Sequence, residues 1–242
     1  MKIIKVKDYK ELSRKASNIL ASQLILKPKS VLGLATGSTP IGTYEELIHL
    51  YNEGVISFSN VITFNLDEYC GLKSNDINSY CNFMKTKLFN HVDIREENIH
   101  IPNGVTKDIQ KECEDYEKEI KKFGGIDIQL LGIGKNGHIG FNEPNLKFQS
   151  KTFLVNLDED TIKANSRFFN SIEDVPRQAI SMGIKTIMNS KKILLLANGE
   201  EKGEILYRAI YGDIIPQVPA SILQLHPDVT IIVDEKAGSC LK

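Results

Sequence analysis

The chain has 242 residues, of which 41% are hydrophobic and 25% are charged, and its 30 basic and 31 acidic residues leave a net charge of −1. This composition is that of a globular protein with a sizeable core, while the interspersed charges exclude a basic nucleic-acid-binding surface. No apolar run approaches the roughly 18 residues of a membrane span. The charged N-terminus does not resemble a signal peptide, and the four cysteines lack metal spacing, so we expect reduced thiols in a soluble, cytoplasmic protein.

Short apolar runs along the chain predict strands, and amphipathic stretches between them predict helices. We expect strands at 2–6, 30–35, 61–66, 126–134, 152–157, 192–197 and 229–234. We expect helices at about 8–24, 40–53, 79–90, 106–123, 159–165, 177–188 and 201–211. Apolar runs without alternation are typical of strands covered on both faces. The pattern therefore predicts an α/β fold for residues 1–242: a single-domain, doubly wound, mostly parallel, Rossmann-like sheet with helices on both faces.

Polar and glycine-rich stretches follow several predicted strands, where sheets of this kind bind ligands. The first is ATGSTP (35–40), which precedes a predicted helix. It offers the hydroxyls and backbone N–H groups of Thr36, Gly37, Ser38 and Thr39 at a helix N-terminus, which is an anion site. Because the lysine of a nucleotide triphosphate loop is absent, a sugar phosphate fits better. An ordinary capped turn is the alternative.

The second stretch, FNLDEYCGL, places Asp67 and Glu68 directly after a predicted strand. A carboxylate held over a pocket at a strand end can act as a general base toward a carbon acid. Acidic residues are also common at strand ends on protein surfaces. The assignment therefore depends on what lies beside Asp67.

The third stretch, LGIGKNGHIGFNEP, contains glycines with the GxGxxG spacing of a dinucleotide-binding loop. Asp158 even lies at a suitable distance for a ribose contact. That motif needs a helix immediately after its glycines. Residues 138–151 contain Asn, Pro and Gly and show no helical periodicity. We therefore reject a dinucleotide site here.

The same stretch carries His138 between Asn136 and Glu143. Histidine titrates near neutral pH, and a neighbouring carboxylate can orient the imidazole and raise its pKa. None of the other histidines has a paired spacing with His138, so we predict no metal site. A structural role of a loop histidine is the alternative.

Two basic residues, Arg167 in ANSRFF and Lys202 in NGEEKGEI, are candidate phosphate partners. An arginine fork and a lysine point charge are the groups expected around a phosphate dianion. Solvated surface charges are the alternative.

Five stretches, in order and over nearly the whole chain, resemble the glucosamine-6-phosphate deaminase (isomerase) family. They are LGLATGSTPIGTY, TFNLDEYCGL, LGIGKNGHIGFNEP, ANSRFF and ASILQLHPDVTIIVDE. The third is the most specific, because the sister 6-phosphogluconolactonases carry a DGHTASLFP-like sequence there. The resemblance implies conversion of glucosamine 6-phosphate and water into fructose 6-phosphate and ammonia, with no cofactor and no metal.

The resemblance also implies roles for individual residues. His138 would move the proton as the sugar ring opens, held by Glu143 and Asn136, and Asp67 would carry a proton from carbon 2 to carbon 1. The implied phosphate ligands are Thr36, Gly37, Ser38, Thr39, Arg167 and Lys202, and the implied lid is about 157–177. The chain has Asn136 where some members have aspartate, and Ser38 where a glycine is frequent.

Three other functions stay open for such a sequence. A lactonase would open a lactone without releasing ammonia. A sugar-phosphate sensor usually loses the acid–base residues and carries an N-terminal DNA-binding module, whereas the first predicted strand begins at residue 2. A pentose-phosphate isomerase would retain the heteroatom of its substrate. Larger, regulated hexamers of the resembled family extend well beyond the last strand, so we expect an unregulated monomer or small homo-oligomer that binds neither nucleic acid nor membrane.

Overall fold

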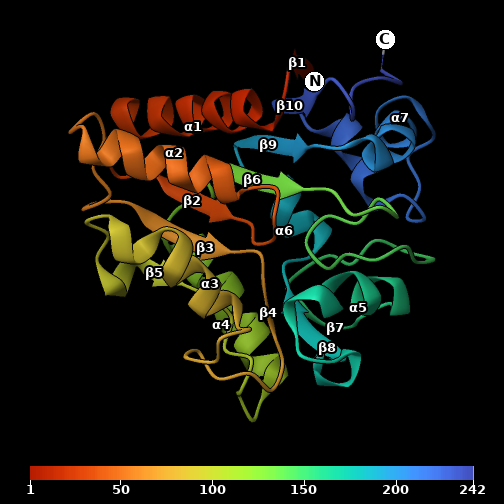
Figure 1. The fold of residues 1–242 in the computed structure, drawn as a ribbon. Helices are drawn as coiled ribbons and strands as arrows, with labels where there is room; N and C mark the ends of the chain where they lie inside the picture. The colour runs from red at the N-terminus through yellow and green to blue at the C-terminus, as the bar shows by residue number, and fades with distance from the viewer. Residues whose placement is uncertain (242) are drawn as a thin grey trace.

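A seven-stranded parallel sheet forms the centre of the molecule (Figure 1). The structure is a computed structural model that describes residues 1–241, apart from the side chains of residues 160, 164 and 168. In spatial order the strands are β1 (Lys2–Val6), β10 (Val229–Asp234), β9 (Lys192–Ala197), β6 (Ile128–Gly132), β2 (Val31–Leu34), β3 (Ile62–Asn65) and β5 (Ile99–His100). All neighbouring pairs run parallel. Six of these strands were predicted, and β5 was not.

Alternate residues of the central strands enter two different hydrophobic cores. In β9, Leu194 and Leu196 pack in one core with α1 and α2, whereas Ile193 and Leu195 pack in the other with α4 and α7. The helices are α1 (Tyr9–Leu26), α2 (Ile41–Asn52), α3 (Tyr80–Lys87), α4 (Ile109–Lys122), α5 (Glu159–Asn165), α6 (Ile184–Met188) and α7 (Gly203–Tyr211). Both faces of a strand are therefore buried, which explains the uninterrupted apolar runs and confirms the doubly wound α/β fold.

A second, antiparallel sheet contains β4 (Asp67–Tyr69), β8 (Gln178–Ser181) and β7 (Phe153–Asn156), with β8 in the middle. Figure 1 shows it beside the main sheet, together with α5. The strand predicted at 152–157 exists, but in this sheet. β4, which begins with Asp67, is an edge strand of this sheet and follows β3 of the main sheet after one residue.

The helix predicted at 177–188 is wrong over its first half. Residues 178–181 form β8, whose backbone pairs with β4 on one side and β7 on the other, and only Ile184–Met188 is helical. Gly183 separates the two, and a Cβ added there would lie 2.3 Å from the backbone oxygen of Lys151. Pairing with distant strands therefore overrides the local helical pattern.

The polar stretches follow the carboxyl ends of neighbouring parallel strands, as predicted. The turn 35–40 follows β2, Asp67 follows β3 after one residue, and 133–151 follows β6. No helix occurs within residues 133–158, all of which the structure describes. The prediction that no crossover helix follows these glycines is therefore confirmed.

Candidate active site

The turn between β2 and α2 is held in place by side chains from other elements. The Tyr9 hydroxyl donates to the backbone oxygens of Ser38 and Thr39, each at 3.1 Å, and accepts from Gly42 N at 2.8 Å. Gly37 has φ +100°, which only glycine adopts easily. Among residues 1–241 no other residue type has a positive φ, so Ser38 stands in ordinary backbone geometry. The turn is therefore a fixed backbone cradle at the start of α2.

Two cations predicted from the sequence approach this turn and the neighbouring loop. Arg167 Nη2 lies 3.5 Å from Ser38 Oγ, and Lys202 Nζ donates to Ile133 O at 2.7 Å. Burial lowers the pKa of Lys202 to about 8, Glu201 opposes the change, and the neighbouring cations Lys135 and Arg167 add to it. Positive charges held this close favour an anion between them. Lys135 was not predicted, although it directly precedes Asn136.

Asp67 is a buried carboxylic acid in contact with the histidine loop, which we define as residues 133–144. Its side chain is 5% exposed, and burial, with a smaller effect of the Glu68 charge, raises its pKa to about 8. Gly140 has φ +56°, and a Cβ there would lie 3.5 Å from Asp67 Oδ2. A side chain at Gly140 would therefore just reach the carboxyl group, so the histidine loop passes next to it. A buried carboxylate with a raised pKa is a strong base.

The Glu68 carboxylate binds the first turn of α3 and does not share the role proposed for Asp67. Its Oε1 accepts from Tyr69 N at 2.8 Å and from Tyr80 N at 2.9 Å, and its Oε2 accepts from Cys81 N at 2.8 Å. Two of these N–H groups belong to the first turn of α3, where a carboxylate is favoured. Glu68 thus fixes the start of α3 against β4.

His138, Asn136 and Glu143 form one cluster, as the sequence predicted. His138 N donates to Asn136 Oδ1 at 3.2 Å, and Asn136 Nδ2 donates to Glu143 Oε2 at 2.9 Å. His138 Nδ1 lies 3.3 Å from Glu143 Oε2, within ion-pair distance but not aligned as a hydrogen bond. The Thr161 hydroxyl in α5 donates to Glu143 Oε1 at 2.5 Å. Sequence reasoning missed Thr161, because only the fold brings α5 to this loop.

The charge of Glu143 is stabilised by these neighbours. Burial alone would raise its pKa, but the His138 imidazole and the donors Thr161 and Asn136 outweigh burial and lower it to about 2. Glu143 is therefore a carboxylate at neutral pH, beside the His138 imidazole. The amide of Asn136 brings a hydrogen bond to this cluster without a charge.

The glycine before this cluster makes room for the imidazole. A Cβ on Gly134 would lie 2.3 Å from His138 Cε1, so we expect Gly134→Ala to displace the ring and lower kcat/KM at least about tenfold, in the range of a misplaced acid–base group. Gly132→Ala is the matched control, because nothing lies within 4 Å of its added Cβ. Steady-state kinetics of the two variants check this. Equal activities would contradict the packing role of Gly134.

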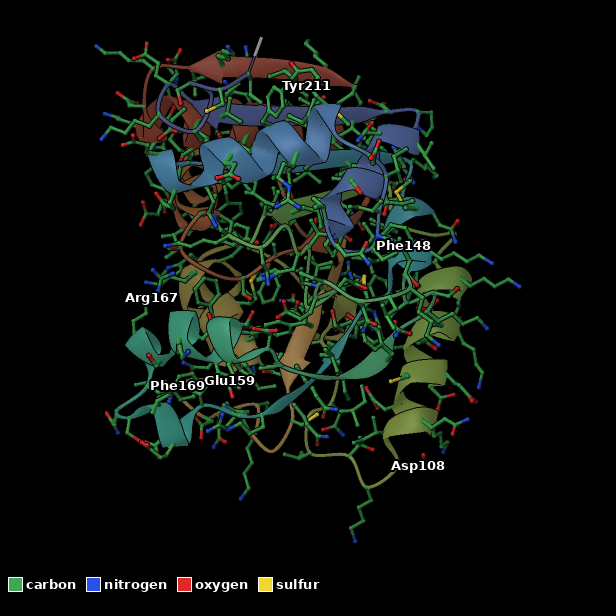
Figure 2. The ribbon with its side chains drawn as sticks, turned by 90° about the vertical axis from the view of Figure 1, so that its right-hand side faces the viewer. Asp108, Phe148, Glu159, Arg167, Phe169 and Tyr211 are labelled. Atoms are coloured by element: carbon green, nitrogen blue, oxygen red, sulfur yellow. The ribbon has the colours of Figure 1, made fainter. Side chains whose placement is uncertain are left out.

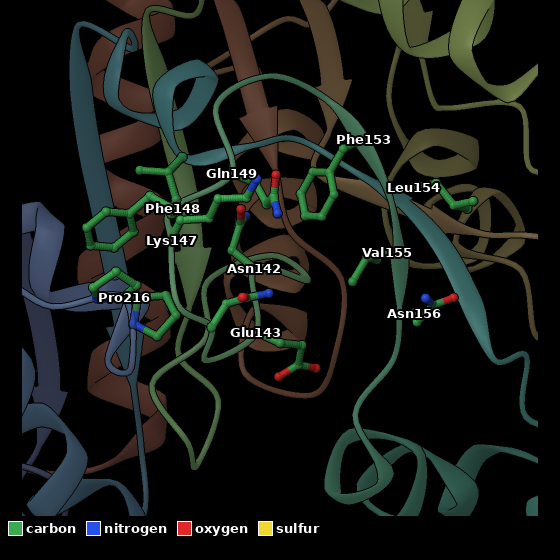
Figure 3. Close-up of a pocket in the computed structure, with 13 residues that line it drawn as sticks. Asn142, Glu143, Lys147, Phe148, Gln149, Phe153, Leu154, Val155, Asn156 and Pro216 are labelled. Carbon is green, nitrogen blue, oxygen red and sulfur yellow. The ribbon is translucent and has the colours of Figure 1, made fainter.

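A cavity of about 260 Å³ lies beside Glu143, between the histidine loop and β7 (Figure 3). Asn142, Glu143, Phe148 and Phe153 line it. Neither Asp67 nor His138 is among its described lining residues. Of the three residues Asn136, His138 and Glu143, only Glu143 lines this cavity.

Several of the predicted site residues contact residues of other segments. Arg167 contacts Ser38, Thr39 Oγ1 donates to Asn198 Oδ1 at 3.0 Å, and Lys202 contacts the start of the histidine loop. Figure 2 shows Arg167 with Glu159 and Phe169 at one edge of the molecule. The side chains that the structure describes contain no cluster of three or more His, Cys, Asp or Glu residues suited to a metal. No helix among the described residues is long and apolar enough to span a membrane. All four cysteines are free thiols.

Comparison with known proteins identifies the family. Residues 8–232 match the family model of glucosamine-6-phosphate isomerases and 6-phosphogluconolactonases. The glucosamine-6-phosphate deaminase of Clostridioides difficile (strain 630) is 57% identical over 241 residues, covering 100% of this chain and 97% of that protein. The deaminase of Clostridium acetobutylicum is 59% identical over 241 residues and covers 100% of both chains.

Solved structures give the same assignment. A structure described as a monomeric glucosamine-6-phosphate deaminase is 49% identical, with a TM-score of 0.97, over 99% of this chain and 100% of that chain. A 6-phosphogluconolactonase from Trypanosoma cruzi is 22% identical with a TM-score of 0.76, over 100% of this chain and 97% of that chain, and shows the shared fold alone. The chain belongs to the glucosamine-6-phosphate deaminase family.

Proposed function

We propose that the chain converts glucosamine 6-phosphate and water into fructose 6-phosphate and ammonia, with Asp67, His138 and Glu143 moving the protons. Relatives of 57% and 59% identity that are named for this deamination support the reaction. One structural observation carries the assignment of residues. The loop that holds the His138–Glu143 pair passes next to the buried carboxyl group of Asp67, since a Cβ added at Gly140 would lie 3.5 Å from Asp67 Oδ2. An acid–base pair and a separate strong base are what ring opening followed by isomerisation needs.

The substrate phosphate is proposed to bind between the 35–40 turn, Arg167 and Lys202. The fixed backbone of the turn, the arginine within 3.5 Å of Ser38 and the lysine beside Arg167 support this. Lys135 adds a further positive charge near Lys202. Phosphate binding is remote from the bonds that change, so its free energy can orient the open-chain sugar over Asp67.

Ring opening is proposed to run through His138. The imidazole transfers the proton between the anomeric hydroxyl and the ring oxygen, and the Glu143 carboxylate stabilises the imidazolium. Asp67 then removes the proton from carbon 2 and delivers it to carbon 1, while one proton of the ammonium group passes to the oxygen on carbon 1. Carbon 1 becomes a primary alcohol, and carbon 2 becomes a protonated imine. Water adds to the imine, and ammonia leaves as the ketone forms. The ammonium group of the substrate acidifies the carbon 2 proton, so this chemistry runs on the groups of the chain itself, and we propose no metal or cofactor.

Residues 157–177 are proposed as a lid over this site. Thr161 in α5 holds Glu143, and Arg167 reaches Ser38 of the 35–40 turn. The same segment therefore contacts both the acid–base cluster and the proposed phosphate site. Closure of such a segment excludes water and completes the site.

The contact of Thr161 predicts a moderate effect on the rate. We expect Thr161→Val to lower kcat about three- to tenfold, because one hydrogen bond to the Glu143 carboxylate is lost. Thr186→Val is the matched control, since the Thr186 hydroxyl donates to Glu117 Oε1 at the same 2.5 Å. Steady-state assays at saturating substrate measure the difference. Equal kcat values in both variants would contradict a role of Thr161 in the reaction.

Incubation with glucosamine 6-phosphate, followed by assays of ammonia and fructose 6-phosphate, tests the proposed function. We expect the two products in equal amounts. Opening of 6-phosphogluconolactone without ammonia release would identify a lactonase, tight sugar-phosphate binding without turnover would identify a sensor, and interconversion of pentose phosphates without ammonia would identify an isomerase. Any of these three results would overturn the proposal.

We further propose that the protein acts as a monomer in the cytoplasm. The relative of 49% identity is described as monomeric, and the four free thiols fit a reducing compartment. Light scattering after size-exclusion chromatography measures the oligomeric state.

A further inference from the structure

Four aromatic rings from four separate segments meet around Tyr69 at the end of β4. The Tyr69 ring centroid lies 4.7 Å from that of Tyr80 in α3 and 5.7 Å from that of Phe141 in the histidine loop. It also lies 5.8 Å from that of Phe169, in the proposed lid, in an edge-to-face arrangement. Edge-to-face and tilted pairs at these distances are favourable. Tyr69 is 1% exposed and contacts each of the other three rings.

The two tyrosine hydroxyls extend this contact in opposite directions. Tyr80 Oη donates to Tyr69 Oη at 3.2 Å. The side chain of Asn165, the last residue of α5, hydrogen-bonds with the Tyr69 hydroxyl. The side chain of Thr36, in the 35–40 turn, hydrogen-bonds with the Tyr80 hydroxyl. The hydroxyls of Thr36, Tyr80 and Tyr69 and the side-chain amide of Asn165 therefore form one chain, which joins the proposed phosphate turn to the proposed lid.

Tyr69 is also coupled to the proposed base through the backbone. Residues i and i+2 of a strand point to the same face, so Asp67 and Tyr69 share one face of β4 and Glu68 takes the other. Glu68 fixes the opposite side through its three backbone hydrogen bonds. Gly140 lies next to Asp67, and Phe141, the next residue, packs against Tyr69. A shift of the Tyr69 ring would therefore move Asp67 relative to the histidine loop.

We propose that Tyr69 is a positioning residue, which couples closure of the 157–177 segment over a bound sugar phosphate to the placement of Asp67. This inference rests on the proposed function. Among the described residues, Tyr69 contacts Tyr80, Phe141, Phe169 and Asn165, and none of these is a proposed phosphate ligand or His138. Its loss should therefore lower kcat far more than it weakens binding of a sugar phosphate.

The absence of tryptophan from the sequence allows a lid-specific probe. Asn170, exposed and three residues beyond Arg167, is replaced by tryptophan, so that fluorescence reports on this segment alone. Glucitol 6-phosphate, an open-chain ester that cannot react, is titrated into Asn170→Trp and into the same protein carrying Tyr69→Phe, Tyr69→Leu or Tyr116→Phe. Tyr116 is the matched control, because its buried hydroxyl donates to Asn65 O at 2.7 Å, away from the lid. The kcat and KM of each variant are measured in parallel.

We expect Tyr69→Phe to lower kcat about fivefold, since it loses the hydroxyl contacts alone, and Tyr69→Leu to lower it about 100-fold. The dissociation constant of glucitol 6-phosphate should change less than about threefold, because Tyr69 does not bind the ligand. The fluorescence response should shrink, because Tyr69 couples closure of residues 157–177 to the placement of Asp67. Tyr116→Phe should match Tyr69→Phe in loss of thermal stability but keep kcat and the response. If Tyr69→Phe instead behaves like Tyr116→Phe, the inference is wrong, whether or not Tyr69→Leu folds. A parent protein that releases no ammonia would refute the proposed function, while the fluorescence response would still test Tyr69.

Discussion

Asp67→Asn is expected to abolish ammonia release from glucosamine 6-phosphate while leaving binding of glucitol 6-phosphate nearly unchanged. The amide has the size of the carboxyl group but cannot accept the carbon 2 proton, and a positioned base contributes about 10²–10⁴-fold. The proposed phosphate ligands lie on other segments and stay intact. A coupled ammonia assay and calorimetric titration with the ester measure the two quantities. Near-normal turnover in this variant would show that Asp67 is not the base that accepts the carbon 2 proton.

A matched control for this variant is Asp234→Asn. Asp234 is another buried carboxylate at the end of a parallel strand, and it accepts from Ala237 N at 2.8 Å and from Gly199 N at 3.1 Å. We expect this variant to lose stability but to keep turnover. The comparison distinguishes the general effect of losing a buried carboxyl group on stability from the effect of losing the proposed base on turnover.

Asp67→Asn should also change how stability depends on pH. The pKa of Asp67 is raised in the folded protein from 3.8 to about 8, so the folded state holds a proton that the unfolded state releases. The stability contributed by this proton is complete below pH 3.8 and is lost as the pH rises to about 8. Thermal unfolding should therefore show the variant gaining stability relative to the parent between pH 4 and pH 8. A constant difference across this range would mean that the carboxyl group is not perturbed.

Glu143→Gln is the second variant with a large expected effect. The uncharged amide no longer stabilises a positive His138, and its NH₂ group would oppose one of the two donors, Asn136 or Thr161. We expect kcat/KM to fall about 10²–10³-fold, as for loss of an acid–base pair. Glu117→Gln is the control, because Glu117 also accepts threonine hydroxyls, from Thr152 and Thr186, outside the site. Similar kinetics in the two variants would contradict the role of Glu143.

The pH dependence of Glu143 has the opposite sign to that of Asp67. Its pKa is lowered in the folded protein from 4.5 to about 2, so the folded state favours the carboxylate. This contribution to stability is present above pH 4.5 and is lost as the pH falls toward 2. In acid titrations followed by circular dichroism, the parent should therefore lose more stability than Glu143→Gln between pH 4.5 and pH 2.

The parts of the fold that were predictable are those with a strong local signal. Apolar runs such as KILLLA and VTIIVD are buried on both faces, and this burial leaves a pattern in the sequence itself. The short strands β4, β5 and β8 carry no such pattern. Residues 178–181 instead form part of a helical pattern, and only pairing with β4 and β7 makes them a strand. The partner strands β4 and β7 have only three and four residues, so their pairing with β8 leaves no periodic pattern in the sequence.

The candidate site divides in the same way. The cluster of Asn136, His138 and Glu143 lies within eight consecutive residues, so the sequence displays it directly. The hydroxyl of Thr161 and the ring of Tyr69 join the site only through tertiary contacts. The spacing of the glycines in the histidine loop is visible in the sequence. Only the structure shows that Gly134 leaves room for the imidazole of His138.

A crystal structure of the protein with glucitol 6-phosphate tests the shared site most directly. We predict the phosphate against the 35–40 turn, Arg167 and Lys202, with carbon 2 within about 3.5 Å of an Asp67 carboxyl oxygen, the distance of reacting atoms. His138 should face the same ligand. A ligand held by the turn with Asp67 and His138 directed at different surfaces would contradict the account.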